Sequence, residues 1–372
     1  MTDTLPAGVR DGIASGRAAL ARLPRVTLAA LPTPLDACPR LTASLGGPTI
    51  MVKRDDCTGL AFGGNKVRQH EYVLGSAVAS GADCLVQGSA SQSNHSRQLA
   101  AAGAKLGLQT FLLPKMDARS TPLQGNFLLD HLLGASIIPI APDESTIGAK
   151  SSLVRRLREE GRSPYVTGMG ADDALALAAL AYVEALFEIV EQLPIGRTLD
   201  WIYTASQGST QAGLLLGCEL LGMPTRVVGV NPMADTHEAY ISPSGVLDLA
   251  RQAASMLGVE SRLTAADIVT EVDFVGPGYG EVSDETLEAI RTLATSEGVL
   301  LDPVYTGKAF AALLSHTRSG RFTPDETVVF VHTGGLPAIF AYSDELTHQH
   351  EGPATPSEPG GTPMKSRKVP TA

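Results

Sequence analysis

One lysine of this chain stands in a setting that favours covalent chemistry. Lys66 directly follows Gly-Gly-Asn at 63–65, shortly after an expected strand at 49–53, and a second small polar loop holds Asn94 and His95. A glycine-rich turn lets a ligand approach closely, and a desolvated lysine amine can form a Schiff base. Most lysines are solvated and Gly-Gly-Asn is an ordinary turn, so this spacing indicates a reactive lysine only together with other features.

Three expected strand-to-helix junctions consist of small polar residues, at 88–95, 205–213 and 332–336. The first N–H groups of a helix and its dipole bind anions, and ligands of open α/β sheets collect at the carboxyl ends of strands. Helix capping and turn formation are the simpler explanation for any one junction. Three of them on one edge of a sheet favour a bound anionic ligand.

The junction at 205–213 suits a phosphate best. Gly208 lets an oxyanion approach the backbone, and Ser209 and Thr210 add hydroxyl donors. The loop lacks the Gly-Lys-Ser/Thr ending of a nucleotide-binding loop, and no GxGxxG motif follows the early strands, so a monophosphate fits better than a nucleotide. A Schiff-base lysine and a monophosphate site are the two features that pyridoxal phosphate requires.

Two tyrosines lie beside glycines or turn residues in the last third of the chain. Tyr279 belongs to Gly-Pro-Gly-Tyr-Gly at 276–280, and Tyr305 belongs to the segment 297–308. A phenol could face a ligand there, although most tyrosines pack half-buried. His332 ends an expected strand and could either lie near a ligand or pack. No imidazole or carboxylate follows at ligand spacing, so no metal site is expected.

Composition excludes several classes of protein. The 372 residues, 44% hydrophobic and 18% charged, are typical of a globular chain with a large core. A net charge of −10 without basic runs argues against a nucleic-acid surface. The apolar stretch 174–190 carries Glu184 and Glu188, which favours a core helix over a membrane span. Four scattered cysteines and an N-terminus unlike a signal peptide favour a reducing cytoplasm.

Strand and helix patterns alternate along the chain. Strands are predicted at 49–53, 84–87, 110–113, 136–140, 201–204, 226–230 and 327–332. Helices are predicted at 96–106, 125–133, 174–192 and 211–221, among others. Apolar strands separated by helices indicate an α/β fold with parallel sheets covered on both faces. The segment 348–372 is rich in Pro, Gly, Ser and Thr, which predicts a disordered tail outside the fold.

Five segments resemble one enzyme family, in family order, between residues 31 and 342. They are VKRDDCTGLAFGGNKVR, QSNHSRQLAAAGAKLG, GNFLLDHLLGA, EGVLLDPVYTGKA and HTGGLPAIFAY. Together they look like the D-cysteine desulfhydrase and 1-aminocyclopropane-1-carboxylate deaminase group of fold-type II pyridoxal phosphate enzymes, which resemble the tryptophan synthase β subunit. The resemblance implies a homodimer whose chains have two α/β domains with the cofactor between them. We expect a larger domain at 1–66 plus 180–347 and a smaller one at 67–179.

The resemblance also implies contacts for the cofactor. Lys66 would hold pyridoxal phosphate as a Schiff base and later move protons at the substrate α-carbon. Asn94 would hydrogen-bond the ring oxygen, and Thr306 would face the pyridine nitrogen. The phosphate would be held by Gly208, Ser209 and Thr210.

The substrate contacts implied by the resemblance come from two other segments. Ser93, with the backbone around Asn94 and His95, would hold the carboxylate of an amino-acid substrate. Tyr279 and Tyr305 would flank the substrate as proton donors or as residues that orient a nucleophile.

Thr306 favours one branch of the family. The deaminases carry glutamate in this motif, and a carboxylate beside the ring nitrogen favours its protonated, strongly electron-withdrawing form. A neutral hydroxyl gives a weaker electron sink, which still suffices for β-elimination because a leaving group departs at once. We therefore expect a lyase that converts a β-substituted alanine such as D-cysteine to pyruvate, ammonia and the leaving group.

Some positions depart from the family pattern and keep other substrates open. The loop at 170–173 has Asp172 and Asp173, which would repel a sulfonate if the loop faces the site and would then weigh against an L-cysteate sulfo-lyase. Gln69 follows Arg68 where lysine is common in the family, and the loop 207–211 looks closer to the deaminase version. β-Replacement, cyclopropane deamination and a non-catalytic amino-acid-binding homologue remain alternatives.

Overall fold

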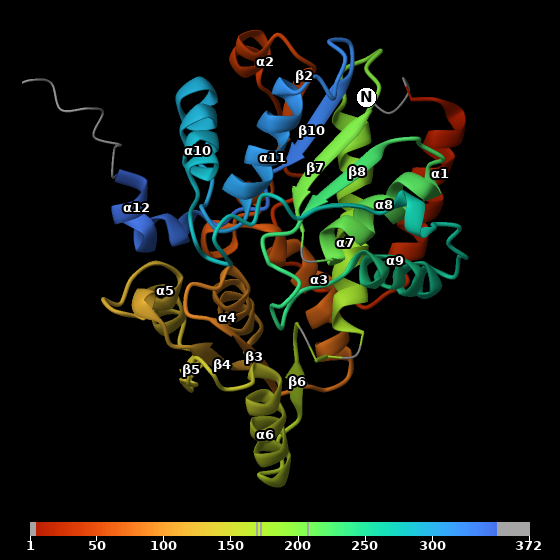
Figure 1. Cartoon of the computed structure of the whole chain (residues 1–372). Coiled ribbons are helices and arrows are strands. Elements are labelled where there is room, and N and C mark those ends of the chain that lie inside the picture. Colours follow the sequence, from red (N-terminus) through yellow and green to blue (C-terminus); the bar gives the residue numbers. More distant parts are fainter. Residues whose placement is uncertain (1–4, 169, 172, 207, 348–372) are drawn as a thin grey trace, which may run out of the picture.

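The structure is a computed structural model that describes residues 5–168, 170–171, 173–206 and 208–347. The tail expected at 348–372 lies outside these residues. Two sheets make up the framework, one of six strands in the order β1-β2-β10-β7-β8-β9 and one of four in the order β5-β4-β3-β6. In Figure 1 the six-stranded sheet lies above and the four-stranded sheet below, with α3 and α4 between them.

The six-stranded sheet is built from strands distant in sequence. Its members are β1 (Leu35–Ala37), β2 (Thr49–Lys53), β10 (Thr327–Val331), β7 (Trp201–Ala205), β8 (Arg226–Val230) and β9 (Val269–Glu271). All neighbouring pairs are parallel except β1 with β2. Successive residues of β2 show burial on both faces, since Met51 enters one apolar cluster while Ile50 and Val52 enter another. The sequences of such strands are continuous apolar runs because water reaches neither face of the sheet.

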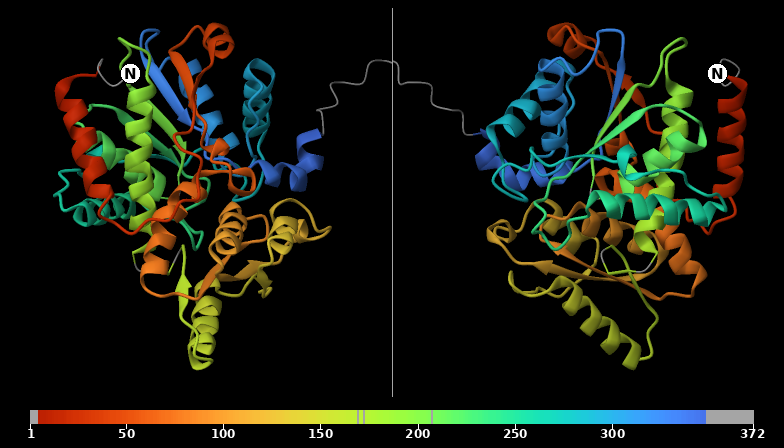
Figure 2. Two further views of the ribbon diagram at one scale, coloured as in Figure 1. Left: turned by 180° about the vertical axis from the view of Figure 1, so that it is seen from behind. Right: turned by 45° about the vertical axis from the view of Figure 1, so that its right-hand side comes forward.

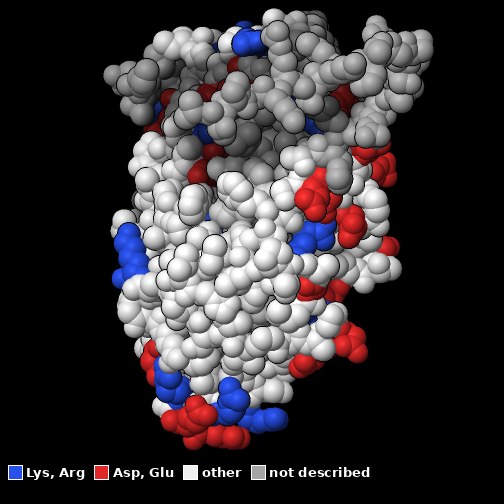
Figure 3. All heavy atoms as spheres, turned by 90° about the vertical axis from the view of Figure 1, so that its left-hand side faces the viewer, with Lys and Arg blue, Asp and Glu red and all other residues white. Residues whose placement is uncertain are grey.

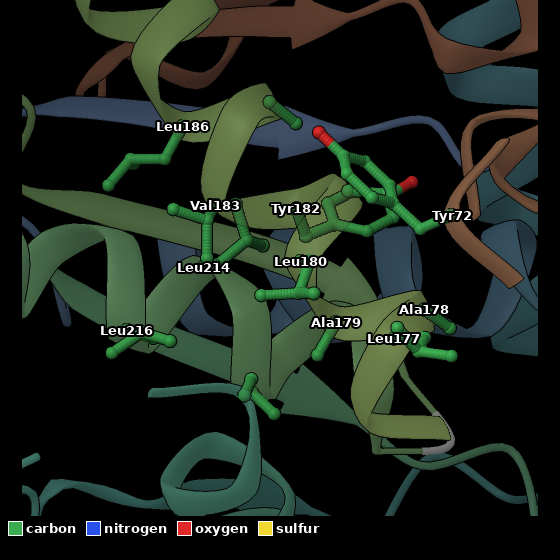
Figure 4. Close-up of a cluster of buried hydrophobic side chains, with 14 of the residues drawn as sticks. Tyr72, Leu177, Ala178, Ala179, Leu180, Tyr182, Val183, Leu186, Leu214 and Leu216 are labelled. Atoms are coloured by element: carbon green, nitrogen blue, oxygen red, sulfur yellow. The ribbon is translucent and has the colours of Figure 1, made fainter. Parts of the chain in front are cut away.

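Helices cover both faces of this sheet. One layer contains α1 (Ala7–Leu20), α3 (Asn65–Ala79), α7 (Ala174–Gln192), α8 (Ser209–Leu220) and α9 (Pro243–Leu257), and the other contains α2 (Pro39–Leu45), α10 (Asp284–Glu297) and α11 (Thr306–Arg318). Figure 4 shows the centre of the first layer, where Leu180 and Val183 of α7 lie near Leu214 of α8. A Cβ on Gly213 would lie 2.0 Å from the carbonyl oxygen of Ala179, so only glycine permits this close crossing of α7 and α8.

The four-stranded sheet is parallel throughout and comes from the segment between α3 and α7. Its strands are β3 (Cys84–Ala90), β4 (Gln109–Lys115), β5 (Ser136–Ile137) and β6 (Pro164–Val166), and its helices are α4 (Asn94–Leu106), α5 (Gly125–Leu132) and α6 (Thr146–Glu159). The two turned views in Figure 2 show α4 on the side of this sheet that faces the larger sheet, and α6 on the far side. The short helix α12 (Ser343–Thr347) ends the described chain.

The predicted fold class is confirmed, with parallel sheets flanked by helices. Each predicted strand is present, although β5 spans only two residues and Ile140 makes an isolated bridge to Lys115. Three strands of three residues each, β1, β6 and β9, were not predicted, because so short a run shows no periodicity. The domain limits at 66/67 and 179/180 remain a prediction. None of the helices in the described part of the chain is long and apolar enough to cross a membrane.

Candidate active site

A cavity of about 360 Å³ lies between the two sheets. Its walls include residues at the carboxyl ends of β3, β7, β8 and β10, which is where α/β sheets bind ligands. The volume falls within the range of small-molecule sites, which starts at about 300 Å³. Eight of the ten predicted site residues line it: Lys66, Ser93, Asn94, His95, Ser209, Thr210, Tyr279 and Tyr305.

Two predicted residues do not line the cavity. Gly208 directly precedes α8 and faces apolar side chains, since a Cβ there would meet Ile241 and Leu249. Thr306 is fully buried, and its Oγ1 donates to Asp302 Oδ1 at 2.6 Å while accepting from the Asp302 N–H at 2.8 Å. The threonine that the resemblance places at the pyridine nitrogen is thus engaged with its own loop.

Lys66 enters the cavity from the first turn of α3. The preceding Gly63 and Gly64 adopt φ values of +65° and +121°, and a Cβ on Gly64 would collide with Gln98 and approach the Thr333 carbonyl. The Lys66 Nζ donates to Gln69 Oε1 at 2.9 Å. Burial lowers the pKa of the Lys66 amine to about 8, and no carboxylate of the described residues opposes this shift. The Lys66 amine therefore loses its proton at a lower pH than a solvated lysine does.

The start of α8 lies beside Lys66 and has the features of the predicted phosphate site. Helix α8 begins at Ser209, so its first N–H groups have no acceptor within the helix, and its dipole is positive at this end. Thr210 Oγ1 lies 3.3 Å from Gln69 Nε2 and 3.5 Å from Asn65 Nδ2. Gln69 thereby links Lys66 to the predicted phosphate loop. Gln207, which precedes this helix start, lies outside the described residues.

The start of α4 forms the opposite wall. Ser93 caps the helix, with its Oγ accepting from the Ser96 N–H at 3.2 Å, and Asn94 and His95 follow in the first turn. Hydroxyl and N–H groups at a helix N-terminus are suited to a carboxylate. The His95 ring lies 4.9 Å from that of His70, measured between ring centroids. Burial, reinforced by the nearby Lys66 charge, lowers the pKa of His70 to about 3, so this imidazole is neutral at physiological pH.

Two phenols close the cavity from the larger sheet's side. The hydroxyl oxygens of Tyr279 and Tyr305 lie 2.6 Å apart, and the Tyr279 ring centroid lies 5.0 Å from that of His237. Burial raises the pKa of Tyr279 to about 12 and that of Tyr305 further, so both phenols are protonated and can donate a proton. Buried Lys308 holds this loop by donating to the carbonyls of Val275 and Gly278, the latter at 2.7 Å.

His332 and Asp173 are not among the residues that line the cavity. Buried His332 lies with Nε2 2.8 Å from the Leu300 carbonyl oxygen and with Nδ1 accepting from the Gly334 N–H. Both ring nitrogens are thus occupied by hydrogen bonds to the backbone. Asp173 is exposed and does not line the cavity, while Asp172 lies outside the described residues. The repulsion of a sulfonate expected from this loop therefore has no support from Asp173.

The polar residues that line the cavity without having been predicted include Gln69, His70, Lys150 and His237. Gln69 and His70 lie three and four residues after Lys66 on one helix, so helical spacing from the lysine could have identified them. Lys150 comes from α6, and burial lowers the pKa of its amine to about 8 against the attraction of Glu238. His237 lies in the connection between β8 and α9, where the sequence carries no periodic signal.

Comparison with known proteins gives consistent results. Residues 26–334 match the family model described as "Pyridoxal-phosphate dependent enzyme". The chain is 39% identical over 328 residues to a D-cysteine desulfhydrase of Salmonella typhi, covering 87% of this chain and 97% of that protein. It is 38% identical over 332 residues to a D-cysteine desulfhydrase of Klebsiella pneumoniae (strain 342), covering 88% and 98%. A crystal structure described as that of an ACC deaminase homologue superimposes with a TM-score of 0.80 at 34% identity, covering 89% and 98%.

Proposed function

This chain belongs to the pyridoxal-phosphate dependent enzymes, and on that premise we propose that it catalyses α,β-elimination from a β-substituted alanine of the D-cysteine type. The products would be pyruvate, ammonia and the β-substituent, which is hydrosulfide for cysteine. The observation that carries the proposal is a half-buried lysine amine with a pKa of about 8 beside a helix N-terminus and a pair of protonated phenols.

The groups around the cavity fit the cofactor. Lys66 offers an amine for the Schiff base, and the start of α8 with Ser209 and Thr210 offers donors for a monophosphate. Asn94, at the start of α4, offers a side-chain amide for a ring substituent. When bound, pyridoxal phosphate supplies an electron sink for bonds broken at the substrate α-carbon.

The chain's own residues divide the remaining work. We assign the substrate carboxylate to Ser93 and the first N–H groups of α4. Lys66 Nζ removes the α-proton, because its lowered pKa allows the uncharged amine to act as a base. The Tyr279 and Tyr305 hydroxyls, 2.6 Å apart, donate a proton to the departing β-substituent.

A threonine at position 306, where the deaminases carry glutamate, favours elimination over cyclopropane deamination. Thr306 bears no charge, and its hydroxyl is bonded to Asp302. Ring opening without a leaving group needs the stronger electron sink that a carboxylate beside the pyridine nitrogen provides. The desulfhydrase relatives support the same choice.

A homodimer in the cytoplasm completes the proposal. Large apolar side chains are exposed on and beside α5 and on the 3₁₀ segment Leu336–Tyr342, which contacts it, with Leu132 at 72% and Phe340 at 70% exposure. The face of the molecule that includes α5 carries few charges in its middle (Figure 3). Such a patch marks an interaction surface. Sedimentation should give a dimer that Leu132→Asp dissociates, and a monomeric wild type would contradict this part. The four cysteines, all free, suit a reducing compartment.

The test is keto-acid formation from a panel of D-cysteine, L-cysteine, L-cysteate and 1-aminocyclopropane-1-carboxylate. We expect pyruvate from D-cysteine, and a loss of at least about 10³-fold in Lys66→Ala because the group that binds the cofactor and moves the proton is gone. Lys105→Ala, at an exposed site on α4, is the control. 2-Oxobutanoate from the cyclopropane substrate, or a new amino acid formed from D-cysteine and a second nucleophile, would overturn the proposal.

A further inference from the structure

The segment Gly-Asn-Phe-Leu-Leu-Asp at 125–130 has no role in the mechanism so far. Its Asn126 is completely buried at the start of α5, behind the cavity wall and not on it. Asn126 Nδ2 donates to the carbonyl oxygen of Gln92 at 2.8 Å and to Asn94 Oδ1 at 2.9 Å. One buried amide thus contacts the residue that we assign to the cofactor ring oxygen.

The contact with Gln92 fixes which way both amides face. A backbone carbonyl only accepts hydrogen bonds, so the Asn126 atom facing Gln92 must be the NH₂ group. The same NH₂ group faces Asn94, so the Asn94 atom on that side must be the oxygen. The NH₂ group of Asn94 is left on the other side of its amide, and Asn94 lines the cavity.

A contact of Arg97 independently indicates the same orientation of the Asn94 amide. Its Nη2 lies 3.4 Å from Asn94 Oδ1, and a guanidinium can only donate. Burial lowers the pKa of Arg97 to about 10, partly offset by Asp130, so the side chain stays charged at neutral pH. Arg97 also donates to the carbonyls of Ala61 and Gly63, the latter at 3.2 Å, in the turn that precedes Lys66.

We propose that Asn126 is a positioning residue: with Arg97 it holds the Asn94 side chain so that its NH₂ group, and not its oxygen, faces the ring oxygen of the cofactor. The inference rests on the proposed function. A donor at this position favours the deprotonated form of the ring oxygen, whereas an acceptor would favour the protonated form. Two residues outside the cavity thus set the protonation of a group inside it.

The first experiment is Asn126→Asp, which keeps the side-chain shape but removes the donor. The new carboxylate would face the Gln92 carbonyl and Asn94 Oδ1, and turning the Asn94 amide over would relieve the second of these contacts. The Asn94 oxygen would then face the cofactor. We expect the absorption of bound pyridoxal phosphate to shift toward the shorter-wavelength form protonated on the ring oxygen, and Kd for the cofactor to rise about tenfold.

Asn126→Ala, which removes the donor without adding a charge, covers the case in which Asn126→Asp does not fold, and it should shift the spectrum in the same direction. A further variant tests the contact with Asn94 directly. Asn94→Asp keeps an acceptor for Asn126 and Arg97 but presents only oxygen to the cavity, so it should give the same spectral shift. The double variant Asn94→Asp/Asn126→Asp should shift the spectrum no further than Asn94→Asp alone, because Asn126 acts through Asn94. Gln124→Glu is the matched control, since its side chain stands at the start of α5 without a capping bond; it should leave the spectrum and Kd unchanged.

The outcomes separate the two claims. If wild-type protein shows no visible band with pyridoxal phosphate, the proposed function fails. If wild type shows the band but the folded Asn126 variants retain its position and Kd, the positioning role of Asn126 is wrong while the function stands. A lower unfolding temperature in Asn126→Asp with an unchanged band in every folded variant would likewise reduce Asn126 to a structural residue.

Discussion

Two cations that lie two residues apart on the same helix, Lys66 and Arg68, have pKa values shifted in opposite directions. Arg68 points from α3 into the protein behind the cavity, where it bonds Asp55 at 2.9 Å and Glu188 at 2.7 Å. Burial alone would lower the pKa of Arg68, but these carboxylates outweigh it and hold the pKa well above its usual range. Lys66 points into the cavity, where its hydrogen-bond partner is the neutral Gln69, and burial lowers the pKa of its amine to about 8.

The difference shows how one helix serves both structure and chemistry. A buried cation with carboxylate partners stays charged and ties elements together, here α3, the segment after β2 and α7. Tyr182 and Thr33 add hydrogen bonds to Asp55 at 2.7 and 2.8 Å, so that network is well satisfied. A buried cation without such partners becomes an uncharged nucleophile. Which neighbours a buried cation has thus decides its role.

The largest effect is expected when the buried ion pairs of Arg68 are removed. Arg68→Met leaves Asp55 and Glu188 buried without their main partner, which costs about 3–5 kcal/mol of the free energy of unfolding. Urea unfolding of the cofactor-free protein measures it. Arg318→Met, which removes an exposed pair with Glu288, is the control and should cost less than about 1 kcal/mol. Equal losses in the two variants would contradict the account.

A carboxylate placed beside Lys66 should raise the pKa of its amine, as the carboxylates beside Arg68 do for that side chain. Gln69→Glu places an anion at the atom now 2.9 Å from Lys66 Nζ, which raises the pKa of the amine by about one to three pH units. Only the deprotonated amine reacts with pyridoxal phosphate. In wild type the rate of cofactor uptake should therefore rise through pH 8 and level off above it.

Stopped-flow absorbance from pH 6 to 10.5 would follow this reaction. The midpoint should move upward in Gln69→Glu and stay near 8 in Gln69→Met, which removes the hydrogen bond without adding charge. A wild-type rate still rising at pH 10 would show that Lys66 keeps the pKa of a solvated lysine.

The smallest effect is expected at a third kind of buried cation. Lys308 donates to the carbonyls of Val275 and Gly278 and bonds no carboxylate of the residues that the structure describes. Burial lowers the pKa of its amine to about 8. Lys308→Met should loosen the loop of Tyr279 and lower kcat about tenfold, because the proton donor is misplaced. The cofactor absorption should stay that of wild type. A loss of cofactor binding would instead place Lys308 in the cofactor site.

The sequence predicted the parts of this site that follow local rules. Gly63 and Gly64 before Lys66 stand out because glycine adopts a positive φ without strain, and the helix starts at Ser93 and Ser209 stand out because capping uses few residue types. The resemblance added the roles of Asn94 and of the tyrosines. The carboxylate partners of Arg68 could not be predicted, because Glu188 lies 120 residues away and meets it only through the packing of α3 on α7.

Contact of Thr306 with the pyridine nitrogen remains a prediction, and the sequence did not reveal the bond of Thr306 to Asp302. The family motif predicted that the neighbouring Tyr305 is a site residue, but the bond from Thr306 to Asp302 depends on the local turn. The helix spacing of Gln69 and His70 was available in the sequence, yet it gains meaning only once Lys66 is known to face a cavity.

The most direct test of the account asks which buried lysine reacts. Lys53, Lys66, Lys150 and Lys308 are all buried or partly buried and all have lowered pKa values. The protein would be loaded with pyridoxal phosphate, reduced with borohydride and digested, and the pyridoxyl group located by peptide mass spectrometry. The account predicts the adduct on Lys66 alone. An adduct on Lys150 or Lys308, or none on Lys66, would contradict it.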